Sequence, residues 1–221
     1  MNKIDYNQQM QTFPVLEIKH KTQNTFCLRV ARPNVSISSG QCFNVGISGI
    51  DINREYSMYS DAAAPYLEFL IRAVEGGLVS TYLQKLKPGD LVELDGPYGE
   101  FCIPPGRINS KFVFIGSGTG IAPFHSFIKT YPTLNYLILH GIRNSDEAYD
   151  ADDYQQGRYI TCVSQNINGQ SMRVTDYLRE NHLSKDSIIY LCGNRNMIID
   201  CVQILFDQGM NGDQIISEVF F

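Results

Sequence analysis

Two short segments of the sequence combine residue types that can bind a phosphate and a flat ring. Residues 54–60 read Arg-Glu-Tyr-Ser-Met-Tyr-Ser, which brings a cation, an aromatic ring and a hydroxyl onto one extended run. Residues 116–123 read Gly-Ser-Gly-Thr-Gly-Ile-Ala-Pro, a glycine-rich turn between an apolar strand and a helix. Such a turn commonly holds a nucleotide phosphate. Two sites of this kind in one short chain favour two dinucleotides and redox chemistry.

A third glycine segment, residues 76–80, reads Gly-Gly-Leu-Val-Ser and opens a short helix. Backbone N–H groups at the start of a helix point out of it and, together with the helix dipole, attract a pyrophosphate. Arg54 and Ser80 could then hold the same phosphates. Taken alone, the segment around Arg54 can equally be an ordinary strand, because tyrosine and serine occur in many strands.

Two segments near the C-terminus are open to two interpretations. Residues 191–197 (Leu-Cys-Gly-Asn-Arg-Asn-Met) join a strand to a helix at the carboxyl edge of the expected sheet, where ligands bind in such folds. Cys192 by itself is nevertheless typical of a packed core thiol. The chain ends Ser-Glu-Val-Phe-Phe at 217–221. Its two aromatic rings are typical of a core, and they also suit a flat ligand.

The glycine turn departs from the usual dinucleotide fingerprint. Ile121 stands where a third glycine is expected, and no acidic residue ends the second strand to bind the ribose hydroxyls. Arg143 follows that strand instead and could pair with a 2′-phosphate, which favours NADPH over NADH. Asp146 and Glu147 follow closely and would offset this attraction, while Arg173 is a second basic candidate.

Residues 1–103 have the pattern of antiparallel β structure. Runs of β-branched and aromatic residues alternate with turn signals such as Pro33-Asn34 and Pro88-Gly89-Asp90. The strands that we expect are Val15–Lys21, Thr25–Ala31, Gln41–Ile47, Glu55–Ser60, Tyr66–Val74 and Asp90–Asp95. A short helix is expected over Val79–Leu86. Six strands with one small helix predict a closed antiparallel barrel.

The pattern changes at Pro104-Pro105-Gly106, so we expect two domains, 1–105 and 106–221. Beyond this point apolar strands alternate with helical stretches, and the clearest helix runs from about Arg195 to Asp207. The five strands that we expect are Phe112–Ile115, Tyr136–His140, Tyr159–Val163, Ser187–Cys192 and Gln214–Phe220. Alternation of this kind predicts a five-stranded parallel sheet with helices on both faces.

The composition of the chain narrows the classes of protein that it can be. Of its 221 residues, 43% are apolar and only 19% are charged, which is ordinary for a globular protein. The net charge of −5 argues against non-specific binding to nucleic acid. The six cysteines contain no Cys-x-x-Cys pair, so neither a zinc site nor a plant-type iron–sulfur cluster is expected. The sequence shows no secretory signal and no membrane span, so a cytoplasmic protein without membrane partners is expected.

These segments together resemble the ferredoxin–NADP reductase superfamily of flavoprotein reductases, and the resemblance extends over nearly the whole chain. Six motifs occur in the order typical of that superfamily. They are Arg-x-Tyr-Ser (54–57), Gly-x-x-Ser (77–80), Gly-Pro-Tyr-Gly-Glu-Phe (96–101), Gly-x-Gly-Thr-Gly-x-x-Pro (116–123), Cys-Gly-x-x-x-Met (192–197) and Glu-x-aromatic (218–220). The resemblance implies a flavin-binding barrel followed by a pyridine-nucleotide domain, with the two rings meeting between them.

The resemblance also implies a role for each residue that matches a motif. Arg54 would bind the FAD pyrophosphate, Tyr56 would stack on the isoalloxazine, and Ser57 would hydrogen-bond near N5. Phe220 would cover the flavin until nicotinamide displaces it. Further FAD contacts are implied for Ile71, Arg72, Ala73, Gly77, Leu78, Val79, Ser80 and Phe221, the last against the adenine. Pyridine-nucleotide contacts are implied for Gly116, Gly118, Thr119, Gly120, Pro123, Arg143, Gly193 and Met197. Catalytic roles are implied for Ser57, Cys192 and Glu218, the last two beside the nicotinamide and the flavin edge.

The function that the resemblance implies is an FAD-dependent reductase that uses NADP(H) or NAD(H). Its electrons would pass to a separate one-electron carrier such as a ferredoxin or a flavodoxin, because the sequence contains no iron–sulfur motif of its own. One alternative is an NAD(P)H:flavin reductase that uses free flavin as a substrate. Another is a non-catalytic electron-transfer subunit that only anchors the flavin.

Overall fold

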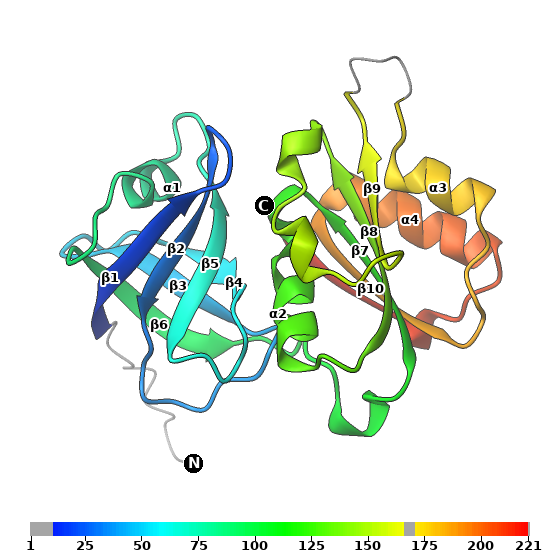
Figure 1. Cartoon of the computed structure of the whole chain (residues 1–221), viewed down its shortest axis with the longest axis horizontal. Coiled ribbons are helices and arrows are strands. Elements are labelled where there is room, and N and C mark those ends of the chain that lie inside the picture. Colours follow the sequence, from blue (N-terminus) through cyan, green and yellow to red (C-terminus); the bar gives the residue numbers. More distant parts are fainter. Residues whose placement is uncertain (1–10, 166–170, 221) are drawn as a thin grey trace, which may run out of the picture. The chain divides into compact units, whose positions relative to one another are not determined.

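The computed structural model describes residues 11–165 and 171–220. By their internal contacts the residues fall into two compact units, Met1–Glu100 and Phe101–Phe221, each of which has its own sheet (Figure 1). Over 11–165 and 171–220, no helix is long and apolar enough to cross a membrane. We propose that the boundary between the flavin and nucleotide domains lies between residues 105 and 106.

The first unit is built on one antiparallel sheet of six strands. Their order in the sheet is β4-β3-β6-β1-β2-β5. The bounds are β1 Gln11–His20, β2 Thr25–Ala31, β3 Cys42–Ile47, β4 Asn53–Ser57, β5 Tyr66–Arg72 and β6 Leu91–Tyr98. The predicted antiparallel sheet is confirmed, with strand ends that differ from the sequence-based bounds by a few residues.

The two edge strands of this sheet come together just after β4. Met58 forms an antiparallel bridge with Phe69 of β5, and the Tyr59 amide donates to the carbonyl of Glu68 at 2.7 Å. This bridge closes the sheet around a core of buried aliphatic and aromatic side chains that includes Phe26, Phe43 and Phe69. Closure leaves the sheet without a free edge at this point.

The helix of the first unit, α1, is short and follows a tight glycine turn. It spans Leu78–Leu83, and Val79 and Leu83 are buried against the barrel core. The sequence-based bounds ran three residues further, to Leu86. The helix ends earlier because the chain turns into the loop at Pro88-Gly89, where the Gly89 amide donates to the Val15 carbonyl.

The second unit is a five-stranded parallel sheet, as predicted. Its strand order is β11-β10-β7-β8-β9. The strands are β7 Lys111–Ser117, β8 Asn135–Ile142, β9 Tyr159–Val163, β10 Ser187–Asn194 and β11 Ile215–Phe220. The α-helices are α2 Ala122–Thr130, α3 Val174–Glu180 and α4 Arg195–Asp207. Short 3₁₀ turns span η1 Pro105–Arg107, η2 Gly118–Ile121, η3 Ser145–Glu147, η4 Ala151–Asp153 and η5 Gly212–Gln214.

The helices cover both faces of this sheet because successive strand residues point to opposite sides. One face is aromatic: Phe114 of β7 stacks on Phe124 of α2 and on Phe112, and tilted or edge-on ring contacts add Phe127 of α2 and Tyr190 of β10. The opposite face is aliphatic and packs against the buried sides of α3 and α4. Its core is formed by Val113, Ile115, Leu139, Ile189, Leu191, Val174, Leu178, Ile198, Cys201 and Leu205.

Candidate functional site

The first group of candidate residues lies on β4 in the first unit. Alternation along the strand puts Arg54 and Tyr56 on one side and Ser57 on the other. Arg54 is exposed, and its Nη1 donates to the Asn53 carbonyl at 2.7 Å. Tyr56 packs partly against the barrel core, and burial raises the pKa of its hydroxyl to about 12 while Arg54 opposes this shift. Ser57 is buried. A guanidinium and a half-buried ring therefore lie on the same side of one strand.

The candidates on β5 lie across the bridge from β4. Tyr56 is two residues before Met58, and Ile71 is two residues after Phe69, so the antiparallel bridge brings these two segments alongside each other. Ile71 is fully buried, whereas Arg72 is half-buried at the end of the strand. The bridge thus brings the segment of Arg54 and Tyr56 alongside that of Arg72, although Arg72 follows Tyr56 by 16 positions in the sequence.

The glycine turn between β5 and α1 is narrow and is held by two hydrogen bonds. The Gly77 amide donates to the Val74 carbonyl at 2.9 Å, and the Val74 amide donates to Ser80 Oγ at 3.1 Å. A Cβ atom at Gly77 would lie 3.0 Å from both of these acceptor oxygens, so a larger residue would be crowded there. No side chain caps the first amides of α1. The Ser80 hydroxyl therefore holds the turn together from within the chain.

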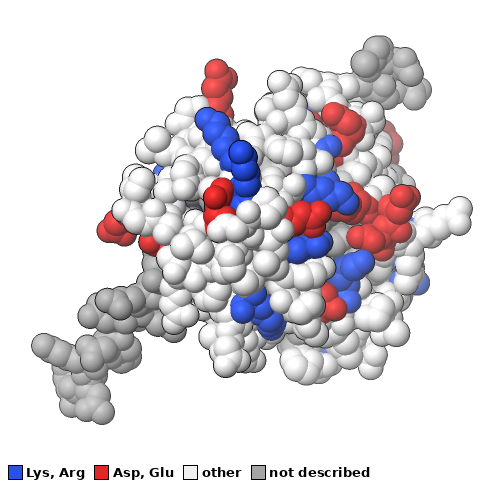
Figure 2. Space-filling model, turned by 60° about the vertical axis from the view of Figure 1, so that its left-hand side comes forward, with Lys and Arg blue, Asp and Glu red and all other residues white. Residues whose placement is uncertain are grey.

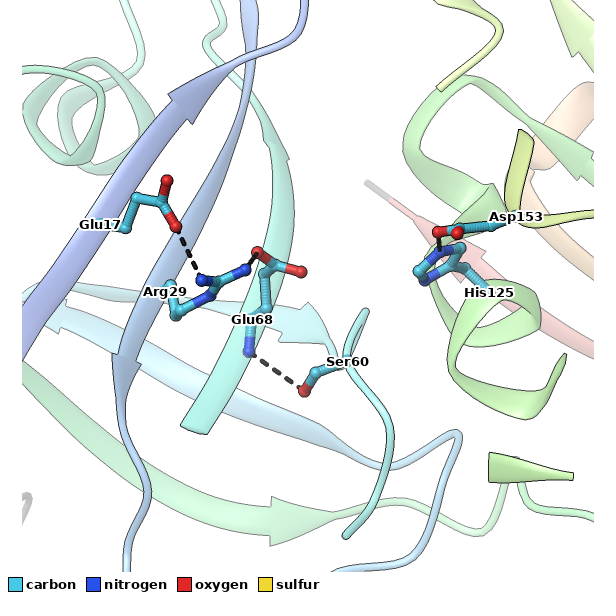
Figure 3. A network of polar contacts seen from close by, with 6 residues as sticks. All are labelled: Glu17, Arg29, Ser60, Glu68, His125 and Asp153. Carbon is cyan, nitrogen blue, oxygen red and sulfur yellow. Dashed lines mark hydrogen bonds and ion pairs between the residues drawn. The ribbon is translucent and has the colours of Figure 1, made fainter. Parts of the chain in front are cut away.

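A second arginine of the barrel, Arg29, has a structural role. It bridges Glu17 and Glu68 at 2.7 and 3.1 Å (Figure 3). Its guanidinium carbon also lies over the ring of Tyr66, 4.1 Å from the ring centroid. These contacts tie β1, β2 and β5 together. In Figure 2, basic side chains lie among acidic ones on the face that is drawn, and most of that face carries neither charge.

The candidate nucleotide turn in the second unit follows β7. Gly118 has a φ of +53°, and the turn then forms one 3₁₀ segment that leads into α2. A Cβ atom at Gly120 would lie 2.8 Å from the carbonyl carbon of Cys192 and from Cα of Gly193. Glycine is therefore required at 120 because the turn touches the backbone at the end of β10. Pro123 lies in the first turn of α2, where proline is well tolerated.

The segment after β10 is locked onto the same turn. The Asn194 amide donates to Ser117 Oγ at 2.9 Å, and Gly193 has a φ of +125° beside Ser117. The Asn194 side chain accepts hydrogen bonds from the amides of Asn196 and Met197. The first amides of α4 are thus capped by the chain itself. The Met197 backbone is consequently part of this cap, which the sequence-based interpretation had not foreseen.

The candidate catalytic residues of the second unit lie on neighbouring strands. Cys192 of β10 pairs in register with Gly116 of β7 on one side and with Glu218 of β11 on the other. Burial raises the pKa of the Cys192 thiol well above its usual range, and the charge of Glu218 adds to this shift. Phe220, two residues further on β11, is half-buried, and Phe221 lies outside the described residues. A protonated thiol thus lies beside a carboxylate at the carboxyl end of the sheet.

The basic candidates for a 2′-phosphate lie at the same edge of this sheet. Arg143 follows β8 and Arg173 precedes α3, and both are exposed. Ile142 pairs in register with Val163 of β9, whose carbonyl accepts from the Met172 amide at 2.9 Å. The backbone therefore brings the two arginines to adjacent strand ends.

The two acidic residues that follow Arg143 differ in their burial. Glu147 is buried, and its carboxylate accepts from Asn144 in the capping box of η3. Asp146 stays exposed.

The His125–Asp153 pair, at 2.8 Å, joins α2 to η4 and lowers the pKa of Asp153 to about 2 (Figure 3).

Two family models match the chain and together cover more than four fifths of it. The model described as an oxidoreductase FAD-binding domain matches residues 14–103, and the model described as an oxidoreductase NAD-binding domain matches residues 114–203. Each match falls on the part of the chain where the sequence motifs had placed that cofactor. The two cofactor classes expected from the sequence, FAD and a pyridine nucleotide, are confirmed at this level.

Relatives and solved structures agree with these models. The chain is 28% identical over 93% of its length to the reductase component of propane 2-monooxygenase from Rhodococcus jostii. It is 25% identical over 93% of its length to the toluate 1,2-dioxygenase electron transfer component of Pseudomonas putida. It spans 62% and 66% of the lengths of these two relatives. A ferredoxin NADP+ reductase from Neisseria gonorrhoeae, solved with bound FAD and NADP, superimposes with a TM-score of 0.82 at 23% identity, covering 96% of this chain and 99% of that one.

A closed antiparallel sheet that carries an FAD-binding match, followed by a parallel sheet that carries an NAD-binding match, defines a two-domain flavin and pyridine-nucleotide oxidoreductase fold. The chain belongs to the ferredoxin–NADP reductase superfamily. The family predicted from the sequence is thereby confirmed.

Proposed function

We propose that the chain is an FAD-dependent reductase that takes electrons from NAD(P)H and passes them to a separate one-electron carrier. The observation that carries this proposal is the tandem of an FAD-binding match and an NAD-binding match on a single chain. The names of two relatives, a reductase component and an electron transfer component, support it. A ferredoxin or a flavodoxin is the class of carrier that we propose.

We assign the flavin to the barrel residues described above. Bound FAD would supply the redox chemistry, since a flavin accepts two electrons as hydride and can release them singly. The Gly77–Ser80 turn, with Leu78 and Val79, and the guanidinium of Arg54 would hold the pyrophosphate. Tyr56 would stack on the ring, and the backbone of Ile71, Arg72 and Ala73 would run beside it. Ser57 would donate a hydrogen bond to the ring edge.

We assign the pyridine nucleotide to the carboxyl edge of the parallel sheet. The turn at Gly116, Gly118, Thr119 and Gly120 would bind its phosphates, and Gly193 would leave room for it. Cys192 and Glu218 would lie beside the reacting ring. The protonated thiol cannot act as a nucleophile at neutral pH, so its role in this proposal is to position the ring.

Anaerobic titration of the purified protein with NADPH and NADH tests this proposal. We expect FAD to co-purify, and either nucleotide to bleach the flavin absorbance stoichiometrically. Re-oxidation by a ferredoxin or a flavodoxin at a rate well above that with free flavin would support the carrier. Faster turnover with free FMN or riboflavin would instead identify a flavin reductase. A bound flavin that neither nucleotide reduces would indicate a flavin-anchoring subunit.

We also propose that NADPH is preferred over NADH, on the basis of the two exposed arginines at adjacent strand ends. A guanidinium can pair with a phosphate through two charge-assisted hydrogen bonds, and losing one such pairing costs about 1.5–3 kcal/mol. Arg143→Ala should therefore lower the NADPH:NADH ratio of kcat/KM by about tenfold or more. Arg179→Ala, which breaks an exposed pair with Asp176 at 3.2 Å on α3, is the matched control and should leave the ratio unchanged. Equal ratios in wild type and Arg143→Ala would remove Arg143 from the site.

A further inference from the structure

One buried histidine of the second unit contacts the candidate nucleotide turn from inside the protein. His140 lies near the end of β8 and is completely buried. Its Nε2 lies 2.8 Å from the carbonyl oxygen of Gly118, and its Nδ1 lies 2.8 Å from the hydroxyl of Tyr159 on β9. A histidine in the middle of a packed sheet is costly unless both ring nitrogens have partners, and here both have them.

These two partners fix the state of the imidazole. A carbonyl oxygen can only accept, so Nε2 must carry the proton that it donates to Gly118. In the neutral ring Nδ1 is then the acceptor, and the Tyr159 hydroxyl donates to it. Burial lowers the pKa of His140 to about 4, so the ring is neutral near pH 7. The Tyr159 ring is itself held by stacking on Tyr154, with ring centroids 4.3 Å apart.

The hydrogen bond to Gly118 determines which way one peptide group of the turn faces. The peptide between Gly118 and Thr119 is trans, so its carbonyl and its N–H point in opposite directions. Because the carbonyl points inward to His140, the Thr119 N–H points away from the histidine, and Thr119 itself is half-buried. Gly118 has a φ of +53°, a left-handed conformation that glycine adopts without a steric penalty.

We propose that His140 is a positioning residue for nucleotide binding, which holds the Gly118–Thr119 peptide so that the Thr119 N–H faces the pyrophosphate. This inference rests on the proposed function, because it assumes that the turn binds the nucleotide. Tyr159 takes part indirectly, by keeping the Nε2–H tautomer. If its hydroxyl is removed, the proton can move to Nδ1, and the bare Nε2 then faces the Gly118 oxygen.

Three variants and one control separate this role from a merely structural one. His140→Leu removes the donor to Gly118, and Tyr159→Phe removes the hydroxyl that selects the tautomer while keeping the ring. His140→Gln places an amide N–H near the position of Nε2 and can restore the donor. His182→Leu changes an exposed histidine between α3 and β10 in the same unit and serves as the control.

The measurement is the Kd of NADP⁺ and of NAD⁺ for each FAD-loaded protein, with the flavin reduction rate at saturating NAD(P)H and the Tm. We expect the Kd of the preferred nucleotide to rise about three- to tenfold in His140→Leu, the scale of one lost hydrogen bond. Tyr159→Phe should shift it in the same direction by a smaller factor. His140→Gln should return it to within about twofold of wild type, and His182→Leu should match wild type.

A structural role predicts a different outcome. A variant that is only less stable shows a lower Tm but an unchanged Kd in its folded fraction. Unchanged Kd values in both His140→Leu and Tyr159→Phe, with tight nucleotide binding by wild type, would overturn the inference and leave the proposed function intact. Should His140→Leu not fold, Tyr159→Phe alone decides the question. If wild type binds neither nucleotide, the proposed function fails and the inference fails with it.

Discussion

Replacing Gly120 with alanine tests how closely the nucleotide turn approaches the end of β10. The added Cβ would lie 2.8 Å from both the Cys192 carbonyl carbon and Gly193 Cα, and closer still to the Cys192 oxygen. All of these atoms belong to the backbone of a buried strand end, so they cannot move aside as a flexible side chain could. Overpacking of this kind typically costs about 1–3 kcal/mol.

The expected shift in Tm follows from this cost. For a unit of this size, 1 kcal/mol corresponds to roughly 4 °C, so Gly120→Ala should lower the calorimetric transition of the second unit by about 4–12 °C. Gly106→Ala is the matched control in the same unit, because nothing lies within 4 Å of its added Cβ. It should shift the transition by no more than about 2 °C in either direction, because alanine in open space acts mainly by restricting the unfolded chain.

The same variant should also affect binding. If the turn is pushed away from β10, its amides lose their position, and the Kd for the pyridine nucleotide should rise along with the fall in Tm. The measurements are differential scanning calorimetry with saturating FAD and a nucleotide titration of the same samples. If the Gly120→Ala protein had the same Tm as the Gly106→Ala protein, the close approach of the turn to the strand would be refuted.

Three further predictions address individual side chains. Tyr56→Ala should weaken flavin binding by about 0.5–1.5 kcal/mol beyond the loss of buried area, measured by flavin fluorescence, and an unchanged Kd would make Tyr56 a plain strand residue. Cys192→Ser should slow flavin reduction in stopped-flow traces without lowering flavin content, whereas a wild-type rate would identify a packed core thiol. His140 should make the fold sensitive to acid, because its pKa is about 4 in the folded state and near 6.5 unfolded. Between these two values the unfolded chain binds a proton that the folded chain does not, so the free energy of unfolding falls as pH falls. In urea unfolding, His140→Gln should lose about 2–3 kcal/mol less of this free energy between pH 7.0 and 4.5 than wild type loses. Equal losses in the two proteins would contradict a buried, neutral histidine.

The fold was predictable because each level of the sequence pointed to the same answer. Alternating strands with glycine and proline turns predicted the antiparallel sheet, and apolar strands alternating with helices predicted the parallel one. Errors concentrated at the ends of elements. Strand β4 begins at Asn53, two residues before the predicted start, and therefore contains Arg54. It ends at Ser57 because Met58 turns to pair with Phe69, a contact that no local pattern encodes.

The candidate site was predictable in its residue types but not in its supporting contacts. Glycine at 120 was expected for a phosphate turn, yet the structure shows that the backbone of Cys192 also excludes a side chain there. Asn194 was passed over, although an asparagine directly before a helix is a common N-cap, and this signal was available in the sequence. His140 carried one signal as well, a polar residue at the end of the apolar run 136–139. Its partners come from residues 22 and 19 positions away, so only the folded sheet reveals them.

Three contacts of the second unit hold the candidate nucleotide turn in place at the carboxyl ends of the strands. In open parallel sheets, ligands bind just beyond the carboxyl ends of the strands. The turns at these ends can present their amides to a ligand only if other contacts hold them in position. Ser117 accepts from the Asn194 amide, Gly120 rests on the Cys192 backbone, and His140 donates to Gly118. In the function that we propose, the nucleotide binds on the other side of these peptides, so a substitution at any of the three should change nucleotide affinity before it changes the flavin site of the barrel.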